Sequence, residues 1–256
     1  MQVADRIRLS LQLAPIYPVH GRIRVSKEQI DDGGKTSLNQ NTEFTRVEIL
    51  RKSEVSAALI DAATDFYRRG WLLGTSGNLS AVLRQDPFRI AITGSGVDKG
   101  HMREEQIIEV DEALNVLSGM YKPSSESALH VTLEKRFGCM AVFHTHSVWS
   151  TILSRQYAPD GGFEIKGYEM LKGLNNVNTH DHSEWFPVIE NSQDMVGLAV
   201  RVKNLLANNA DIHCFLLSGH GLYTWGSTIE EARRHVEAIE FLLEVFTHSE
   251  NSVRKN

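Results

Sequence analysis

The chain of 256 residues has little cysteine, no long apolar run and no excess of positive charge. Its two cysteines, Cys139 and Cys214, both lie in apolar segments typical of strands, which favours buried free thiols in a reducing compartment. No apolar stretch approaches the ~20 residues that a membrane-spanning helix needs. A net charge of −5 provides no basic surface for nucleic acid. We therefore expect a cytoplasmic protein that binds neither membranes nor nucleic acid.

The N-terminal part of the sequence differs from the rest. Residues 1–45 include a Gly33-Gly34 pair and the polar stretch 35–42, and they show no sustained periodicity. This composition predicts a poorly ordered extension. We expect residues 46–256 to form a single domain.

Helical and strand patterns alternate from Ser53 onwards, and Gly70 supplies the first helix stop. Helices are expected over 53–70, 125–135, 193–206 and 228–246, with a further one beginning near residue 148. Strands are expected over 79–83, 88–93, 139–146, 186–189, 214–217 and 222–225. Because these do not follow strict βαβ units, we predict an α/β fold with a mixed sheet covered by helices on both faces.

Three histidines indicate a metal site. His144 and His146 end a buried strand, in which residues two apart share a face, and His220 follows another strand. Three imidazoles with one open position are typical of a catalytic zinc rather than a structural one. A His-x-His pair alone is common in a chain with 11 histidines. The carboxyl end of a buried strand is nevertheless where α/β proteins place their sites, so we predict a metal-dependent enzyme.

Three small polar clusters are candidates for phosphate binding: residues 74–80 (Gly-Thr-Ser-Gly-Asn-Leu-Ser), 93–99 (Thr-Gly-Ser-Gly-Val-Asp-Lys) and 123–126 (Pro-Ser-Ser-Glu). Glycine lets backbone N–H groups approach an anion, and the helix that starts near Ser125 adds its dipole. Each cluster alone is an ordinary turn, but the set, with Lys99 nearby, favours phosphate binding. None is a Walker A loop or a dinucleotide fingerprint, so nucleotide binding is not implied.

Two carboxylates are candidates for acid–base chemistry. Glu126 lies at a helix start, and Glu169 opens a short amphipathic helix. Either could equally be a charge that stabilises a helix dipole or faces solvent. Their spacing alone does not choose between these roles.

Taken together, five motifs resemble the class II aldolase/adducin family. They are Gly-Thr-Ser-Gly-Asn-Leu-Ser (74–80), Ser-Gly-Val-Asp-Lys (95–99), Lys-Pro-Ser-Ser-Glu (122–126), His-Thr-His-Ser (144–147) and His-Gly-Leu-Tyr-Thr-Trp-Gly (220–226). The resemblance covers about residues 54–248. It implies a three-layer α/β/α sandwich with a mixed, largely antiparallel central sheet, assembled as a homo-oligomer, typically a tetramer, with sites near subunit interfaces. Residues 163–173 and 187–191 further resemble the dehydratase branch of the family.

The resemblance also implies roles for individual residues. One Zn²⁺ per subunit would be held by His144, His146 and His220. The phosphate of a sugar-phosphate substrate would be bound by Gly77, Asn78, Ser95, Gly96, Ser124 and Ser125. Glu169 matches the position of the dehydratase base. Glu126 matches a carboxylate that aldolases of the family use beside the metal, a position at which dehydratases vary.

The activity that the resemblance implies is that of a hydro-lyase in methionine salvage. It would remove water from 5-methylthioribulose 1-phosphate to give 2,3-diketo-5-methylthiopentyl 1-phosphate. The alternative among enzymes is a class II sugar-phosphate aldolase or 4-epimerase, which Glu126 keeps open. Adducin-type relatives raise a third possibility, an interaction module without metal. A scaffold, however, has no reason to hold three imidazoles together.

Overall fold

The computed structural model describes the backbone of residues 40–253 and the side chains of residues 52–135 and 137–249. Of the poorly ordered extension expected over residues 1–45, residues 1–39 lie outside the described residues. Residues 40–45 are helical. They belong to the first helix, α1, which runs from Gln40 to Arg68 and so begins before the predicted start at Ser53.

The described strands form one nine-stranded sheet in the order β4-β3-β2-β1-β5-β9-β8-β7-β6. Their bounds are β1 (Asn78–Gln85), β2 (Phe88–Thr93), β3 (Ile107–Asp111), β4 (Val116–Ser118), β5 (Ala141–Thr145), β6 (Gly162–Lys166), β7 (Ser183–Ile189), β8 (Cys214–Leu217) and β9 (Gly221–Gly226). Every neighbouring pair is antiparallel except β7 and β8, which are parallel. The predicted mixed, largely antiparallel sheet is confirmed.

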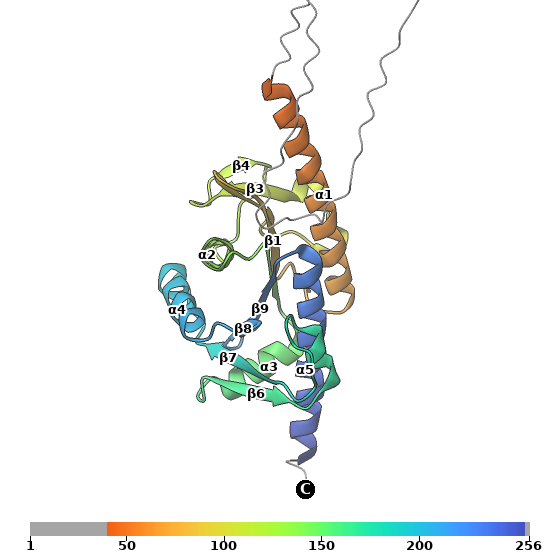
Figure 1. The fold of residues 1–256 in the computed structure, drawn as a ribbon, viewed down its shortest axis with the longest axis vertical. Coiled ribbons are helices and arrows are strands. Elements are labelled where there is room, and N and C mark those ends of the chain that lie inside the picture. The colour runs from red at the N-terminus through yellow and green to blue at the C-terminus, as the bar shows by residue number, and fades with distance from the viewer. Residues whose placement is uncertain (1–39, 254–256) are drawn as a thin grey trace, which may run out of the picture. The chain divides into compact units, whose positions relative to one another are not determined.

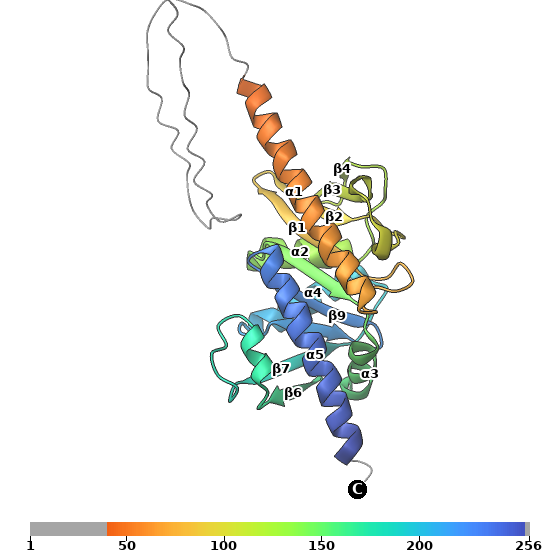
Figure 2. The same cartoon turned by 90° about the vertical axis from the view of Figure 1, so that its right-hand side faces the viewer.

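Helices cover both faces of the sheet (Figures 1 and 2). The remaining elements are α2 (Ser127–Phe137), α3 (Val148–Tyr157), α4 (Met195–Asn208), α5 (Ile229–Val253) and the 3₁₀ helices η1 (Lys99–His101), η2 (Glu104–Gln106) and η3 (Glu169–Gly173). On one face α1, α3 and α5 contribute to the apolar clusters; on the other, α2 and α4 pack against Phe215. The three-layer α/β/α sandwich is thereby confirmed.

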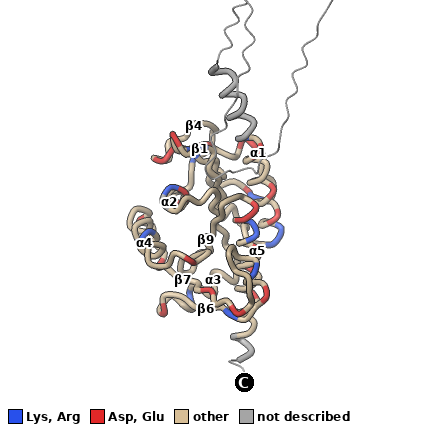
Figure 3. Tube along the Cα trace, in the orientation of Figure 1, with Lys and Arg blue, Asp and Glu red and all other residues tan. Residues whose placement is uncertain are grey.

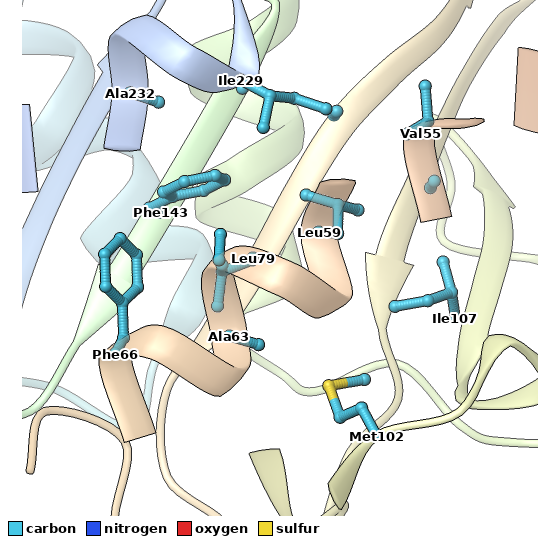
Figure 4. Close-up of a cluster of buried hydrophobic side chains, with 14 of the residues drawn as sticks. Val55, Leu59, Ala63, Phe66, Leu79, Met102, Ile107, Phe143, Ile229 and Ala232 are labelled. Carbon is cyan, nitrogen blue, oxygen red and sulfur yellow. The ribbon is translucent and has the colours of Figure 1, made fainter. Parts of the chain in front are cut away.

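The core on the α1 face is built from the helical periodicity seen in the sequence. Val55, Leu59 and Phe66 of α1 belong to one buried cluster with Phe143 of β5, and the ring centroids of Phe66 and Phe143 lie 5.9 Å apart (Figure 4). All four side chains are buried, and burying a large apolar side chain contributes roughly 1.5–3 kcal/mol relative to leaving it exposed. This cluster fixes β5, the strand that carries His144, against the helical layer.

Acidic and basic residues both occur along α1 and α5 (Figure 3). Arg233 of α5 lies 2.6 Å from Asp61 and 3.3 Å from Asp65, both of α1. Partly exposed ion pairs of this kind contribute roughly 0–1 kcal/mol. The two helices are therefore held to the sheet mainly by the apolar side chains beneath them.

Strand direction decides which loops can share a site. Because β5 and β8 are each antiparallel to β9, and β7 is parallel to β8, the strands β5, β7 and β8 all run the same way. We call the side where they finish, next to His144, the histidine end. Strand β6 is antiparallel to β7 and finishes at the opposite side, the far end. In Figure 2, α3, which follows β5, lies to the right of the sheet, and the turquoise turn after β6 lies to the left.

Three strands were not predicted. Strand β6 carries a clear signal in hindsight, because Phe163 and Ile165 are buried while Glu164 and Lys166 are exposed, which is the alternation of a half-buried strand. Strands β3 and β4 extend the sheet beyond β2. The three residues of β4 are all exposed, so no apolar pattern marks it.

Candidate metal centre

The structure brings the three predicted histidines together. Nε2 of His146 lies 2.8 Å from Nε2 of His144 and 3.1 Å from Nε2 of His220, and the third separation is 3.3 Å. An oxygen of Glu126 joins them, 3.0 Å from Nε2 of His220. One ligand atom from each of the four residues falls within 4.8 Å of all the others. Among the described residues this is the group suited to hold a metal ion.

Local structure places each imidazole. His144 lies opposite Tyr223 in the β5–β9 register, and the two rings stack with centroids 4.0 Å apart. His146 comes just after β5, where its backbone N–H donates to the carbonyl of Trp71 at 2.8 Å. His220 lies in the turn between β8 and β9. The contacts with Tyr223 and Trp71 thus hold His144 and His146 in place before any metal binds.

Gly221 allows the turn to approach the two strand histidines. A Cβ at this position would meet the carbonyl oxygen of Thr145 and would lie 3.1 Å from ring atoms of both His144 and His146. Any larger residue must push the turn and β5 apart. The motif Gly219-His220-Gly221 therefore has a packing reason for its second glycine.

The protonation of the histidines suits metal binding. Nδ1 of His144 lies 2.9 Å from the carbonyl oxygen of Leu222, so Nδ1–H donates and Nε2 carries its lone pair. Burial lowers the pKa of His144, and burial together with the neighbouring His144 and His220 lowers the pKa of His146 to about 3. The lone pair on Nε2 of His144 points toward Nε2 of His146 and Nε2 of His220, 2.8 and 3.3 Å away. A cation among these three nitrogens would accept that lone pair, so the donor set fits a metal.

Glu126 adds a negative charge to the group. Burial acts to raise the pKa of its carboxyl, but the neighbouring His144 and His220 outweigh that effect and lower the pKa. The carboxyl is therefore ionised at neutral pH. Three imidazole nitrogens and a carboxylate oxygen are a donor set that Zn²⁺ accepts.

The candidate phosphate-binding clusters also meet at the histidine end. Asn78 lies opposite His144 in the β1–β5 register, the Ser95-Gly96 turn follows β2, and Ser124 donates to Glu126 at 3.2 Å. Gly77 has a φ of +68°, and a Cβ there would lie 2.6 Å from the carbonyl oxygen of His144. The remaining cluster residue, Ser125, is exposed just before α2.

Lys99 ties two of these clusters together. Its buried ammonium donates to the carbonyl of Thr75 at 3.2 Å and to that of Val97 at 2.9 Å. Burial lowers the pKa of Lys99 to about 8, while Asp98 and Glu126 act in the opposite direction. The lysine thus keeps a positive charge close behind both glycine turns.

The structure places Glu169 away from the metal group of its own chain. Glu169 opens η3 after β6 and so lies at the far end of the sheet. The carboxylate is 71% exposed and pairs with Lys172 at 2.5 Å. Just beyond η3, the backbone N–H of Asn175 donates a hydrogen bond to Nε2 of His235, and its carbonyl accepts one from Nε2 of His213, the residue before β8. Within one chain Glu126 alone of the two candidate carboxylates adjoins the histidines.

A buried polar group beside Glu126 was missed by the sequence analysis. Asn78 donates to Glu126 at 2.7 Å, and His130 lies against Asn78. Glu126, His130 and Glu134 are spaced four residues apart at the start of and along α2, which places them on one helical face. That spacing of polar residues on a buried face was the available signal.

These features define a class of protein. The chain matches the family described as "Class II Aldolase and Adducin N-terminal domain" over residues 57–247, and it belongs to the class II aldolase/adducin family. It is 43% identical over 196 residues to the methylthioribulose-1-phosphate dehydratase of Xylella fastidiosa (strain M12), covering 75% of this chain and 88% of that protein. It is 42% identical over 193 residues to the enzyme of the same name from Methylococcus capsulatus, covering 75% and 92%.

Solved structures agree on the fold. YgbL from Escherichia coli superposes with a TM-score of 0.62 at 27% identity, covering 78% of this chain and 89% of that one. The L-fuculose-1-phosphate aldolase of Thermus thermophilus gives a TM-score of 0.61 at 23% identity, covering 78% and 96%. The second likeness supports the fold only.

Proposed function

We propose that the chain is a zinc-dependent hydro-lyase that converts 5-methylthioribulose 1-phosphate to 2,3-diketo-5-methylthiopentyl 1-phosphate in methionine salvage, within the cytoplasm. One observation carries the proposal: three histidines and Glu126 converge in a chain 43% identical to a protein named for this activity. No helix among residues 40–253 is long and apolar enough to cross a membrane.

His144, His146 and His220 hold the zinc in this proposal. When bound, the metal supplies Lewis acidity that makes a proton next to a coordinated carbonyl easier to remove. Glu126, ionised and 3.0 Å from His220, places a negative charge beside the three histidines. A low pKa makes this carboxylate an acceptor at neutral pH, which favours water as the acid that protonates the leaving hydroxyl.

The phosphate is assigned to the three turns at the histidine end. The residues proposed to bind it are Gly77, Asn78, Ser95, Gly96, Ser124 and Ser125. The Asn78 amide uses one N–H on Glu126 and keeps its second for the phosphate. Lys99 adds positive charge from behind. Binding the phosphate away from the reacting carbons fixes the register of the substrate.

Glu169 is proposed as the base, supplied by a second copy of the chain. The carboxylate is exposed at the far end of the sheet, so it faces outward from its own subunit. If the far end of one copy meets the histidine end of another, Glu169 enters the neighbour's site. A homo-oligomer, with four copies as the arrangement typical of the family, is part of the proposal.

The surface next to the histidines supports such an assembly. Leu73, Val148 and Ile152 are large apolar residues that are exposed in the single chain. Leu73 lies two residues after Trp71, which accepts the bond from His146, and Val148 lies two residues beyond His146. Exposed apolar residues grouped beside a site favour coverage by another protein surface.

The elimination then needs two proton movements, and the tautomerisation that follows needs a third. Glu169 takes the proton from C3, the C4 hydroxyl leaves with a proton as water, and the resulting enol tautomerises to the diketone. The carbon skeleton and phosphate are unchanged, so the substrate loses one molecule of water and nothing else.

A sugar-phosphate aldolase or 4-epimerase is the second candidate, because Glu126 lies within the metal group. Product analysis separates the two. The metal-loaded protein is incubated with 5-methylthioribulose 1-phosphate, L-fuculose 1-phosphate or L-rhamnulose 1-phosphate. We expect loss of water from the first and no reaction with the other two. Cleavage of either deoxyhexulose phosphate into two three-carbon products, with the methylthio substrate untouched, would replace the dehydratase proposal.

A further inference from the structure

A buried chain of hydrogen bonds leads from the interior of the sheet to Glu126. Glu134 lies 2.6 Å from the hydroxyl of Ser80, which lies 2.7 Å from Nδ1 of His130. Nε2 of His130 contacts Oδ1 of Asn78, whose Nδ2 donates to Glu126 at 2.7 Å. None of Glu134, Ser80 and His130 has any role in the site as proposed so far.

The contacts of the Asn78 amide set the direction of the bonds in this series. Nδ2 of Asn78 donates to Glu126, so the Asn78 oxygen faces Nε2 of His130, and an amide oxygen only accepts. Nε2 of His130 must then donate, which leaves Nδ1 as an acceptor for the hydroxyl of Ser80. The hydroxyl of Ser80 has a single proton, which it donates to Nδ1, so at the 2.6 Å contact Glu134 must be protonated and donate to the oxygen of Ser80.

The surroundings of the chain agree with that assignment. Ser80, His130 and Glu134 are fully buried, and Asn78 is nearly so. Burial raises the pKa of Glu134 well above its usual range and lowers the pKa of His130 to about 3, so both groups are neutral. Because both groups are neutral, this series of hydrogen bonds avoids the large penalty of placing an unpaired charge in the interior.

His130 is placed to influence both Glu126 and the metal group. Its ring lies edge-on to Tyr223, with centroids 5.9 Å apart, and Tyr223 stacks on His144. One residue thus contacts both the amide that orients Glu126 and the ring that supports a histidine of the metal group. Without a donor at Nε2, the Asn78 amide is free to turn its oxygen toward Glu126 and repel it.

We propose that His130 is a positioning residue: by donating from Nε2 to Asn78 it locks the amide, which holds Glu126 with one oxygen on Asn78 and the other toward His220. The inference deepens the proposed function, on which its kinetic test rests, but its spectroscopic test does not. Ser80 and the protonated Glu134 serve to fix the tautomer of His130.

Kinetics of matched variants test the positioning role. His130→Phe keeps a ring but has no N–H, and we expect kcat to fall about 10–100-fold with KM and zinc content unchanged. His130→Gln places an amide N–H near the position of Nε2 and should recover most of the loss. Glu134→Gln, which still donates to Ser80, should retain wild-type kcat, whereas Glu134→Leu should not.

The tautomer is measured directly on wild-type holoenzyme labelled with ¹⁵N-histidine, and the His130 signals are identified by their loss in His130→Gln. We expect the neutral Nε2–H tautomer from about pH 6 to about pH 8. An Nδ1–H tautomer or a charged ring would overturn the inference whatever reaction the protein catalyses. If the tautomer is as expected but His130→Gln is as slow as His130→Phe, or KM rises in place of the fall in kcat, the positioning role is also wrong. Failure to dehydrate the methylthio substrate would instead contradict the proposed function alone.

Discussion

An oxygen of Glu126 lies 3.0 Å from Nε2 of His220. Glu126 comes from the start of α2, and His220 comes from the turn between β8 and β9. Their contact requires the central strands from β1 to β8 to be assembled in order. The group proposed to hold the metal therefore exists only in the folded protein, so metal binding would be coupled to folding stability.

Replacing a histidine of the group should remove the metal. His144→Ala, His146→Ala and His220→Ala should each lose bound zinc and activity, because each change removes one of the three imidazoles proposed to hold the ion. Zinc is measured by elemental analysis of the purified protein, and circular dichroism checks the fold. His101→Ala, at an exposed histidine of η1, is the matched control and should keep its zinc. One zinc per chain in any of the three variants would refute the assignment.

Gly221→Ala should weaken zinc binding without touching a ligand. The added methyl meets the backbone of Thr145 and the rings of both strand histidines, so the turn carrying His220 must move outward. By analogy with outer-shell substitutions, we expect zinc affinity to fall about 10–100-fold in a chelator competition assay. Gly138→Ala is the control: its φ of +67° makes the substitution strained, but it has open space and lies at the end of α2. Equal zinc affinity in both variants would argue against the packing role of Gly221.

The grouping of the three histidines could be predicted from the sequence because its signals are local. Two imidazoles on one face follow from the two-residue period of a strand, and a strand end followed by Gly219-His220-Gly221 marks the third. The closeness of Glu126 depends on how α2 packs across β1 and β5, which no spacing in the chain encodes. For that reason the sequence left its role open.

The location of Glu169 could not be predicted from the sequence, for a different reason. Its end of the sheet is set by the direction of β6, and that strand was not predicted although Phe163 and Ile165 alternate with charged residues. The long helices and the inner strands β5, β8 and β9 were predicted because their apolar patterns are strong. The edge strand β4 has no buried residue to mark it, so a pattern of burial cannot find it.

The serines of the polar clusters should affect substrate binding more than chemistry. Ser95→Ala and Ser125→Ala each remove a hydroxyl from exposed turns at the histidine end. If the phosphate is held equally in the ground and transition states, KM rises and kcat changes little. Steady-state kinetics with the phosphorylated and the dephosphorylated substrate measure this. Equal reaction of the dephosphorylated substrate would mean that these turns do not bind phosphate.

Glu240 should make the stability of the protein depend on pH. Its buried carboxyl accepts a bond from Thr145 at 3.0 Å, directly beneath the histidine strand. Burial raises its pKa to about 7, partly offset by hydrogen bonds from Ser147 and Thr145. The unfolded chain, with an ordinary pKa of ~4.3, binds fewer protons between these two values, so stability falls as pH rises through that window and levels off above about pH 7.

Denaturant unfolding of wild type and Glu240→Gln from about pH 5 to about pH 8 tests this. The amide cannot ionise, so the wild type should lose on the order of 3 kcal/mol of unfolding free energy relative to the variant as the pH rises. Glu230→Gln, at an exposed position in the first turn of α5, is the control and should follow the wild type. Parallel curves for wild type and Glu240→Gln would show that Glu240 keeps an ordinary pKa.

Mixing two inactive variants should restore activity if Glu169 serves the site of a neighbouring copy. Glu169→Gln keeps the histidines but lacks the base, and its loss should reduce kcat about 10²–10⁴-fold and stop exchange of the C3 hydrogen with solvent deuterium. His146→Ala keeps Glu169 but lacks the metal. Refolded together, they form hybrid sites in which intact histidines of one copy meet Glu169 of another, and dehydration should reappear. Refolding either variant alone is the control, and Glu126→Gln should leave deuterium exchange measurable. Because Glu126 adjoins the histidines of its own chain, exchange lost only in Glu126→Gln, with no recovery on mixing, would transfer proton abstraction to Glu126 and favour aldolase-type chemistry.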